Sequence, residues 1–232
     1  MLRMENVSKT YPHRGQLVTA LDGANAEIRD GDFVSIVGPS GSGKSTLLLM
    51  LGGMLSPSGG RVLLDDQSLY DLDANARAQL RKEKVGFVFQ TFNLVPYLSA
   101  LENVQIPLFL SKTDEMEQKD RAVALLERVG LGDRLHHKPS ELSVGQQQRV
   151  ALARMLANDP AVILADEPTG NLDPETSQQV IDFLEKVNVE GRTVVMVTHD
   201  PRAAERAKRI LRLDRGAIVS EKPGQKNRHA AA

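Results

Sequence analysis

Residues 38–45 read Gly-Pro-Ser-Gly-Ser-Gly-Lys-Ser and satisfy the phosphate-loop pattern G-x-x-x-x-G-K-[ST]. The preceding run, Phe33–Val37, is apolar and largely β-branched, which is typical of a buried parallel strand. The following run, Thr46–Leu51, consists mostly of good helix formers. Because the pattern requires this strand–loop–helix order, the chain is predicted to have an α/β fold built around a phosphate-binding loop.

The chemistry of the loop follows from its residue types. Its glycines permit backbone angles that let successive N–H groups ring a phosphate, next to the positive end of the helix dipole. The ammonium group of Lys44 can reach the β and γ phosphates, and the hydroxyl of Ser45 can ligate Mg2+. The nucleotide-binding residues predicted here are Gly38, Pro39, Ser40, Gly41, Ser42, Gly43, Lys44, Ser45 and Thr46. The alternative is a glycine-rich turn before a helix; a chance match occurs in about 1% of chains this long.

Composition limits the class of protein. The 232 residues fit one α/β domain, and 41% hydrophobic with 25% charged residues is ordinary for a globular protein. The net charge of −1 gives no global attraction to nucleic acid, so no nucleic-acid partner is expected. No cysteine is present, and no apolar run is long enough to span or directly insert into a bilayer.

Strand and helix patterns alternate along the chain. Leu2–Val7 and Val18–Ile28 predict an antiparallel β layer near the start. Further strands are predicted at Arg61–Leu64, Val85–Phe89, Ala161–Ala165 and Thr193–Thr198. Helices are predicted at Ala74–Arg81 and after the proline-containing caps Asp173-Pro174 and Asp200-Pro201. This alternation indicates a mainly parallel sheet.

The stretch from Thr91 to about residue 157 has a helical pattern and interrupts the strands. We therefore expect a helical subdomain inserted in the core, with a solvated charged face around residues 114–121. The residues from Glu221 to Ala232 are rich in Lys, Arg, Gly and Ala. We expect one domain at 1–221 and a disordered tail at 222–232.

A second cluster of polar residues follows the later strands. Asp166 and Glu167 end the strand of residues 161–165, where ligands collect in parallel sheets. Asp166 is placed to hold Mg2+, and Glu167 to act as the general base toward water. The alternative is that both are solvated acids at a strand end, a weak pattern that gains force only downstream of a phosphate loop.

Ser143-Val144-Gly145-Gln146 opens the helix predicted at Gln147–Ala157. The pattern S-x-x-Q is a capping box, in which Ser143 caps the helix and Gln146 reaches back. A helix N-terminus with a serine hydroxyl and a glycine N–H is also a phosphate receptor. Both interpretations can hold, so Ser143, Gly145 and Gln146 are nucleotide-binding candidates.

Three single residues complete the candidates. His199 follows the strand of residues 193–198 and can contact a γ-phosphate or its attacking water, although a lone histidine is more often an exposed loop residue. Gln90 ends the Val85–Phe89 strand and is placed to touch Mg2+ or water. Tyr11 either stacks on a nucleobase or serves in packing, and the sequence leaves these two open.

These residues together resemble the nucleotide-binding domain of ATP-binding-cassette (ABC) transporters. Over residues 1–221, Tyr11, Gly38–Ser45, Gln90, Leu142–Gln146, Ala161–Glu167, Gly170–Asp173 and His199 look like that family's motifs in the family's order. Residues 85–108 and 166–173 look like the subgroup serving lipoprotein release and macrolide export. One departure is Val144, where the usual signature has glycine; it puts the rate and fine geometry of hydrolysis in question.

The resemblance implies an ATPase that uses ATP and Mg2+. Two copies would dock head to tail, each ATP lying between the phosphate loop of one chain and Ser143–Gln146 of the other, with Asp173 in the loop near the dimer contact. Hydrolysis at Glu167 would act through Gln90 and the helical insert on a separate membrane-spanning permease. The chain is then expected at the cytoplasmic face of the cell membrane, held there by that partner.

The resemblance leaves two functions open. One is the ATPase subunit of an exporter or a lipid or lipoprotein extraction complex. The other is a regulatory ABC ATPase that drives a membrane partner in cell division or wall remodelling without transport. Soluble ABC proteins of translation or DNA repair fit poorly, because they carry two cassettes or a long coiled coil.

Overall fold

Two sheets organise the chain in the computed structural model, which describes residues 1–109 and 114–224. The first sheet is antiparallel, with the strand order β2 (Gln16–Ile28), β1 (Leu2–His13), β4 (Gly59–Leu64) and β5 (Gln67–Ser68). The second has the order β10 (Ala217–Pro223), β9 (Arg209–Asp214), β3 (Phe33–Val37), β8 (Thr193–Val197), β7 (Val162–Asp166) and β6 (Val85–Phe89). All its pairings are parallel except that of β10 with β9. The predicted fold class is therefore confirmed.

The inner strands β3, β8 and β7 of the second sheet are buried on both faces. In β8, Val194 and Met196 pack into one apolar cluster, while Val195 and Val197 pack into the other. Successive side chains of a strand point to opposite faces, so a continuous apolar run is what a doubly covered strand requires. The sheet thus separates two apolar cores.

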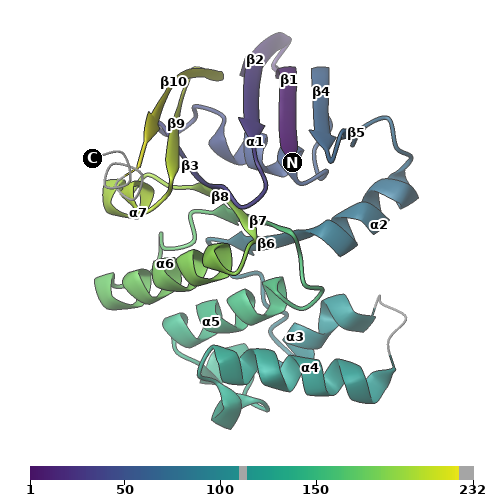
Figure 1. Ribbon diagram of the computed structural model, residues 1–232, viewed down its shortest axis with the longest axis vertical. Coiled ribbons are helices and arrows are strands. Elements are labelled where there is room, and N and C mark those ends of the chain that lie inside the picture. Colours follow the sequence, from purple (N-terminus) through teal and green to yellow (C-terminus); the bar gives the residue numbers. More distant parts are fainter. Residues whose placement is uncertain (110–113, 225–232) are drawn as a thin grey trace.

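The helices divide between these two cores (Figure 1). Helix α1 (Lys44–Leu51) packs between the two sheets. The opposite face is covered by α3 (Ala100–Phe109), α4 (Glu115–Arg128), α5 (Val144–Met155) and α6 (Pro174–Val189). Helices α2 (Ala74–Lys84) and α7 (Pro201–Glu205) lie at opposite sides of the molecule. Two short 3-10 turns, η1 (Gly132–Arg134) and η2 (Pro139–Glu141), connect α4 to α5. No helix within residues 1–109 and 114–224 has the length and apolar character needed to cross a membrane.

Helices α3, α4 and α5 lie between β6 and β7 in the chain and pack on one another. Asp114 caps the start of α4, and its carboxylate accepts hydrogen bonds from the backbone N–H groups of Met116 and Glu117. The charged residues of its outer face are exposed: Glu115, Glu117, Lys119, Asp120 and Arg121. Of these, Arg121 also donates a hydrogen bond from Nε to the Ala157 carbonyl oxygen. The interpretation of this charge run as a solvated face is confirmed.

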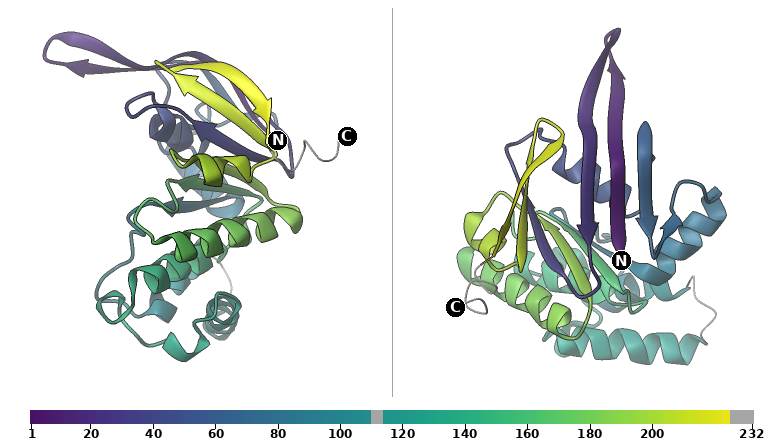
Figure 2. Two further views of the ribbon diagram at one scale, coloured as in Figure 1. Left: turned by 90° about the vertical axis from the view of Figure 1, so that its left-hand side faces the viewer. Right: turned by 45° about the horizontal axis from the view of Figure 1, so that its top comes forward.

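Strand β1 extends farther than predicted, to His13 instead of Val7. Register shifts between Met4 and Val7, and again on either side of Lys9, interrupt the alternation that marks a strand in sequence. With β2 it forms a hairpin that protrudes beyond the rest of its sheet (Figure 2). This hairpin carries Tyr11.

The predicted start of the tail is wrong. Residues 221–223 belong to β10, where Glu221 pairs with Leu211 and its carboxylate lies 2.6 Å from Nε of Arg209. A charged edge strand resembles a tail in composition, because one side of an edge strand is solvated. Residues 225–232 of the expected tail lie outside the described residues.

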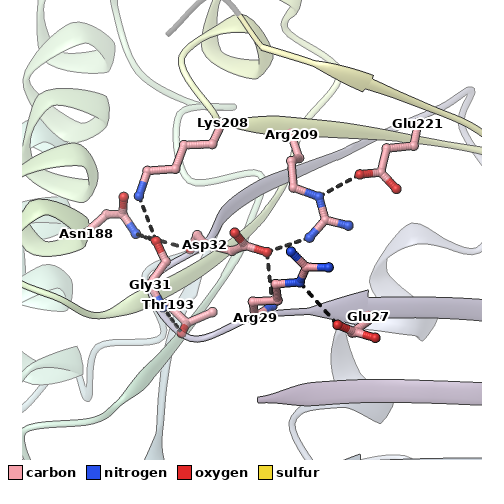
Figure 3. A network of polar contacts seen from close by, with 9 residues as sticks. All are labelled: Glu27, Arg29, Gly31, Asp32, Asn188, Thr193, Lys208, Arg209 and Glu221. Carbon is pink, nitrogen blue, oxygen red and sulfur yellow. Dashed lines mark hydrogen bonds and ion pairs between the residues drawn. The ribbon is translucent and has the colours of Figure 1, made fainter. Parts of the chain in front are cut away.

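A network of hydrogen bonds around Gly31 and Asp32, here called the polar clasp, lies at the end of the sheet where β3 begins (Figure 3). Asn188, near the end of α6, donates hydrogen bonds from Nδ2 to the carbonyl oxygens of Gly31, Asp32 and Arg192. Lys208 also donates to the Gly31 carbonyl, and the Gly31 N–H donates to the hydroxyl of Thr193. The clasp therefore fixes the turn before β3 against α6, β8 and β9.

We expect Asn188→Ala to lower the free energy of unfolding by about 1–3 kcal/mol, because it removes the amide donor from buried carbonyls. Asn188 is 4% exposed. The neighbouring Val189 is 81% exposed, so Val189→Ala is the matched control and should change stability little. Urea unfolding of both variants measures the difference, and equal stability of the two would contradict the structural role of Asn188.

Candidate functional site

The site lies where four parallel strands end together. The pairs Ile36–Val197, Asp166–Val197 and Phe89–Asp166 are in register across β3, β8, β7 and β6. The loops that leave these strand ends carry the phosphate loop, His199, Glu167 and Gln90. This is the carboxyl edge of a parallel sheet, where such folds bind ligands.

The phosphate loop joins β3 to α1. Gly43 occupies the cap position of α1 with φ +101°, and a Cβ there would lie 2.2 Å from the carbonyl oxygen of Ala20, so only glycine fits. The ammonium group of Lys44 donates to the carbonyl oxygens of Gly38 and Pro39, at 2.9 and 3.0 Å. The lysine side chain thus curls back over the loop whose amides form the predicted phosphate cradle.

Ser45 and Asp166 face one another across the site. The Ser45 hydroxyl donates to Oδ1 of Asp166 at 3.0 Å, which links the first turn of α1 to the end of β7. Burial raises the pKa of the Asp166 carboxyl, the Ser45 hydrogen bond partly offsets this, and the charge of Glu167 adds to the rise. A carboxylate and a hydroxyl oxygen are ligands that suit Mg2+, so the residues present fit this ion.

Glu167 and His199 form the second polar pair. The distance between Nδ1 of His199 and Oε2 of Glu167 is 2.9 Å, and the backbone N–H of His199 donates to the same oxygen at 3.2 Å. The Glu167 side chain is 16% exposed and that of His199 is 69% exposed. Glu167 has φ +47°, a left-handed conformation that is unfavourable for a residue with a side chain. Such strain is typical of functional positions whose surroundings fix the backbone.

Gln90 lies against the loop that follows β7. Its Nε2 donates to Oδ1 of Asn171 at 3.3 Å, and Nδ2 of Asn171 donates back to the Gln90 carbonyl at 3.2 Å. A Cβ at Gly170 would lie 2.8 Å from Gln90 Nε2. The structure therefore joins Gln90 to residues 170–171, and its predicted contact with Mg2+ stays a prediction.

Ser143 is the cap residue before α5 and forms a complete capping box with Gln146. Its hydroxyl accepts from the backbone N–H of Gln146, and Oε1 of Gln146 accepts from the backbone N–H of Ser143. The capping interpretation is confirmed, and the phosphate-binding interpretation stays a prediction. Gly145 is backed by the side chain of Thr176, 2.8 Å from where a Cβ would lie, while Val144 is 48% exposed.

Two other candidates make their contacts outside the Ser45–Asp166 and Glu167–His199 pairs. Tyr11 is 37% exposed on the β1–β2 hairpin, with the ammonium group of Lys9 5.3 Å from its ring centre. Asp173 caps α6 by accepting from the backbone N–H groups of Glu175 and Thr176. The Thr176 hydroxyl and these N–H groups hold the pKa of the Asp173 carboxyl below its usual range. Nucleotide contact by either residue stays a prediction.

The sequence did not single out Arg154 or Thr176 as site residues. Arg154 donates from α5 to the carbonyl oxygens of Phe92 and Asn93 in the segment after Gln90. A basic residue in the last turn of a helix is too common a feature to reveal such a contact. A surface hollow of about 840 Å³ lies between α6 and α7 and is bordered by His199, and its lining includes no residue of the phosphate loop.

Comparison with known proteins places the chain in a family. The model of the family described as ABC transporter matches residues 21–170. An uncharacterised ABC transporter ATP-binding protein of Methanocaldococcus jannaschii, MJ0796, is 47% identical over 226 residues, covering 95% of this chain and 96% of the relative. The chain belongs to the ABC transporter family and is its ATP-binding cassette, an ATPase that binds ATP.

Two further comparisons bear on the whole protein. The macrolide export ATP-binding/permease protein MacB of Hyphomonas neptunium is 45% identical over all of this chain, but the chain spans only 36% of that relative. A solved structure described as a dimeric post-hydrolysis state of the cassette MJ0796 with ADP and Pi matches with a TM-score of 0.90 and 44% identity, over 96% of this chain and 98% of that one.

We expect Asp166→Asn to raise the melting temperature of the metal-free protein at pH 7. Because the pKa of Asp166 is raised on folding, the folded state binds its proton up to a higher pH, and stability falls as the pH rises through this range. The gain should vanish below about pH 4, where the carboxyl is protonated in both states. Melting curves in EDTA measure it.

Asp173→Asn is the control of opposite sign. The pKa of the Asp173 carboxyl is lower in the folded protein than in the unfolded chain, so the ionised carboxylate stabilises the fold at pH values above the unfolded-chain pKa. Asp173→Asn removes this contribution and should therefore melt at a lower temperature at pH 7. A lower melting temperature for Asp166→Asn at neutral pH would contradict the desolvation argument.

Proposed function

We propose that the chain is the ATP-hydrolysing subunit of a membrane-spanning ABC exporter or a lipid or lipoprotein extraction complex, and works as a head-to-tail dimer at the cytoplasmic face of the membrane. The observation that carries the catalytic part is the pairing of Glu167 with His199 beside the Ser45–Asp166 pair. Two carboxylates, a hydroxyl and an imidazole meet at one sheet edge, as a phosphoryl-transfer site requires.

Binding uses the phosphate loop. The backbone N–H groups of residues 38–45 and the start of α1 receive the triphosphate, and Lys44 turns its ammonium group from the carbonyls of Gly38 and Pro39 to the β and γ phosphates. Ser45 and Asp166, with Gln90 nearby, would hold Mg2+. When bound, Mg2+ supplies charge that neutralises the phosphates during transfer.

Hydrolysis uses the second pair. Glu167 accepts a proton from the attacking water, whose oxygen bonds to the γ phosphorus as the bond to the β-phosphate oxygen breaks, giving ADP and phosphate. His199 holds the Glu167 carboxylate at 2.9 Å and keeps it oriented toward the site. The strained backbone of Glu167 sets the direction from which the carboxylate acts.

A dimer is supported by the separation of the two phosphate-binding motifs. The phosphate loop opens α1 in one apolar core, and Ser143 opens α5, whose apolar face lies in the other core across the sheet. Completing a site from both motifs therefore calls for a second copy. The dimeric state of the solved MJ0796 cassette, at 44% identity, supports the same arrangement.

A membrane permease is supported by the relatives. MacB is described as an ATP-binding/permease protein, whereas MJ0796 has nearly the same span as this chain. We assign the permease to a groove of about 790 Å³ between α2, β6 and α3, because it combines basic residues with apolar ones. Its lining includes Arg81, Lys82, Phe87, Phe89 and Ile106. We propose that the permease is a separate polypeptide.

We expect Glu167→Gln to lower ATP turnover by about 10²-fold or more, because the amide cannot accept the proton of water. ATP binding should persist, since the phosphate loop and Asp166 are unchanged, and ATP should then hold the dimer together. Phosphate release and size-exclusion chromatography with ATP measure the two effects.

Glu175→Gln is the matched control, an exposed acid in the first turn of α6. It should leave both measurements unchanged. Normal turnover in the Glu167 variant would exclude this residue as the base.

A mixing experiment tests the shared site. Ser143→Asp keeps a good helix cap but places a negative charge against the γ-phosphate, and Lys44→Ala removes the lysine from the other half. Each variant alone should be inactive. Mixed in equal amounts, they form heterodimers with one intact site, so turnover should recover to roughly a quarter of the unmodified value per chain.

Ser143→Asn is the control, because it caps the helix without adding charge and should retain much more activity than Ser143→Asp. No recovery on mixing, with dimers demonstrated, would show that each chain completes its own site.

A further inference from the structure

The segment that follows Gln90 has an unfavourable backbone. Phe92 has φ +56° and Asn93 has φ +51°, so two consecutive residues with side chains lie in the left-handed region. Asparagine tolerates this region, but a bulky aromatic residue rarely does. Such a conformation persists only when the surroundings determine it.

Arg154 holds both residues in this conformation through hydrogen bonds to their carbonyl oxygens. Its two terminal nitrogens donate separately, to the Phe92 carbonyl oxygen at 2.6 Å and to the Asn93 carbonyl oxygen at 2.7 Å. These are the carbonyls of the two left-handed residues. The planar guanidinium group has the fork geometry that such a two-point contact needs. The side chain is half-buried in the last turn of α5, and burial lowers its pKa. The two carbonyl oxygens therefore replace water as partners of the charged guanidinium group.

The Gln90 end of this segment is bound to the loop that follows the catalytic residue Glu167. Gln90 and Asn171 exchange hydrogen bonds, and Asn171 belongs to the loop that follows Glu167. Residues 90–93 are therefore gripped by that loop at one end and by α5 at the other. Residues 90–93 and Arg154 therefore form a hydrogen-bonded connection between the loop after Glu167 and α5.

Helix α5 has a second anchor between Arg154 and Ser143. Gln148 is fully buried, and its Nε2 donates to the carbonyl oxygen of Pro168 at 2.6 Å. At 1.5 Å per residue, Gln148 lies about 9 Å along the axis from Arg154 and about 7.5 Å from Ser143. A stiff helix pivoting at Gln148 moves its two ends by similar amounts.

Resting on the proposed dimeric function, we propose that Arg154 is a positioning residue that couples residues 90–93 to α5. The state of Gln90 beside the nucleotide of one site then sets the placement of Ser143, which serves the nucleotide held by the partner. Each chain in this way transmits the occupancy of its own site to the other.

The test uses the Glu167→Gln protein as the reference, to prevent turnover. The chain has no cysteine, so Glu117→Cys on α4 and Ser220→Cys on β10 give unique spin labels at exposed positions. The label distance is measured with and without ATP and Mg2+, in labelled chain diluted into unlabelled chain. ATP affinity of the monomer and ATP-driven dimer affinity are measured in parallel.

Arg154→Met should bind ATP as the reference does, but lose the ATP-dependent change in label distance and dimerise about three- to thirty-fold more weakly. Arg154→Lys, which keeps the charge without the fork, should show a smaller loss of the same kind and decides the matter if Arg154→Met does not fold. The matched control is Arg149→Met, because Arg149 lies on the same helix and donates to the Val129 carbonyl instead. It should keep the distance change.

Unchanged distance response and dimer affinity in a folded Arg154 variant would overturn the coupling role, as would an equal loss in Arg149→Met. A reference protein that neither responds to ATP nor dimerises would instead overturn the proposed dimeric function. The two failures are therefore distinguishable.

Discussion

The site depends on the in-register ends of four parallel strands. Hydrogen bonding fixes Ile36, Val197, Asp166 and Phe89 at one edge of the sheet, so each following loop starts from a known position. Two apolar cores hold the sheet from both faces and leave little freedom to that edge. This rigidity is what lets Glu167 keep a left-handed backbone at the point where its carboxylate meets His199.

The same rigidity explains the electrostatics of the site. Asp166 is carried on a buried strand, and desolvation raises the pKa of its carboxyl. The Ser45 hydroxyl offsets only part of this cost, while a divalent cation would offset far more. In contrast, Asp173 caps an exposed helix start and its pKa is lowered. Asp173 therefore stabilises the fold, whereas Asp166 carries a desolvation cost that binding of a cation can relieve.

Local pattern was enough to predict the phosphate loop, the Asp166–Glu167 strand end and the parallel sheet, because each depends on residues adjacent in sequence. The bonds of Gln90 to Asn171 and of Arg154 to Phe92 and Asn93 join distant segments, and no periodicity marks them. The length of β1 was hidden by its register shifts, and the end of β10 by its charged edge. The missed features are therefore those set by tertiary packing.

The sheet also determines where the two halves of the chain can communicate. Helix α1 and helix α5 lie on opposite faces, and a closely packed sheet offers no direct contact between them. Strand β6 is the edge strand on the side of α5, and the chain leaves it at Gln90 to cross toward the helical face. A signal from the nucleotide must therefore pass around this edge, and the segment held by Asn171 and Arg154 provides a short hydrogen-bonded route. Because Phe92 and Asn93 have unfavourable backbone angles, we expect this segment to change position when its contact with Asn171 or Arg154 is lost.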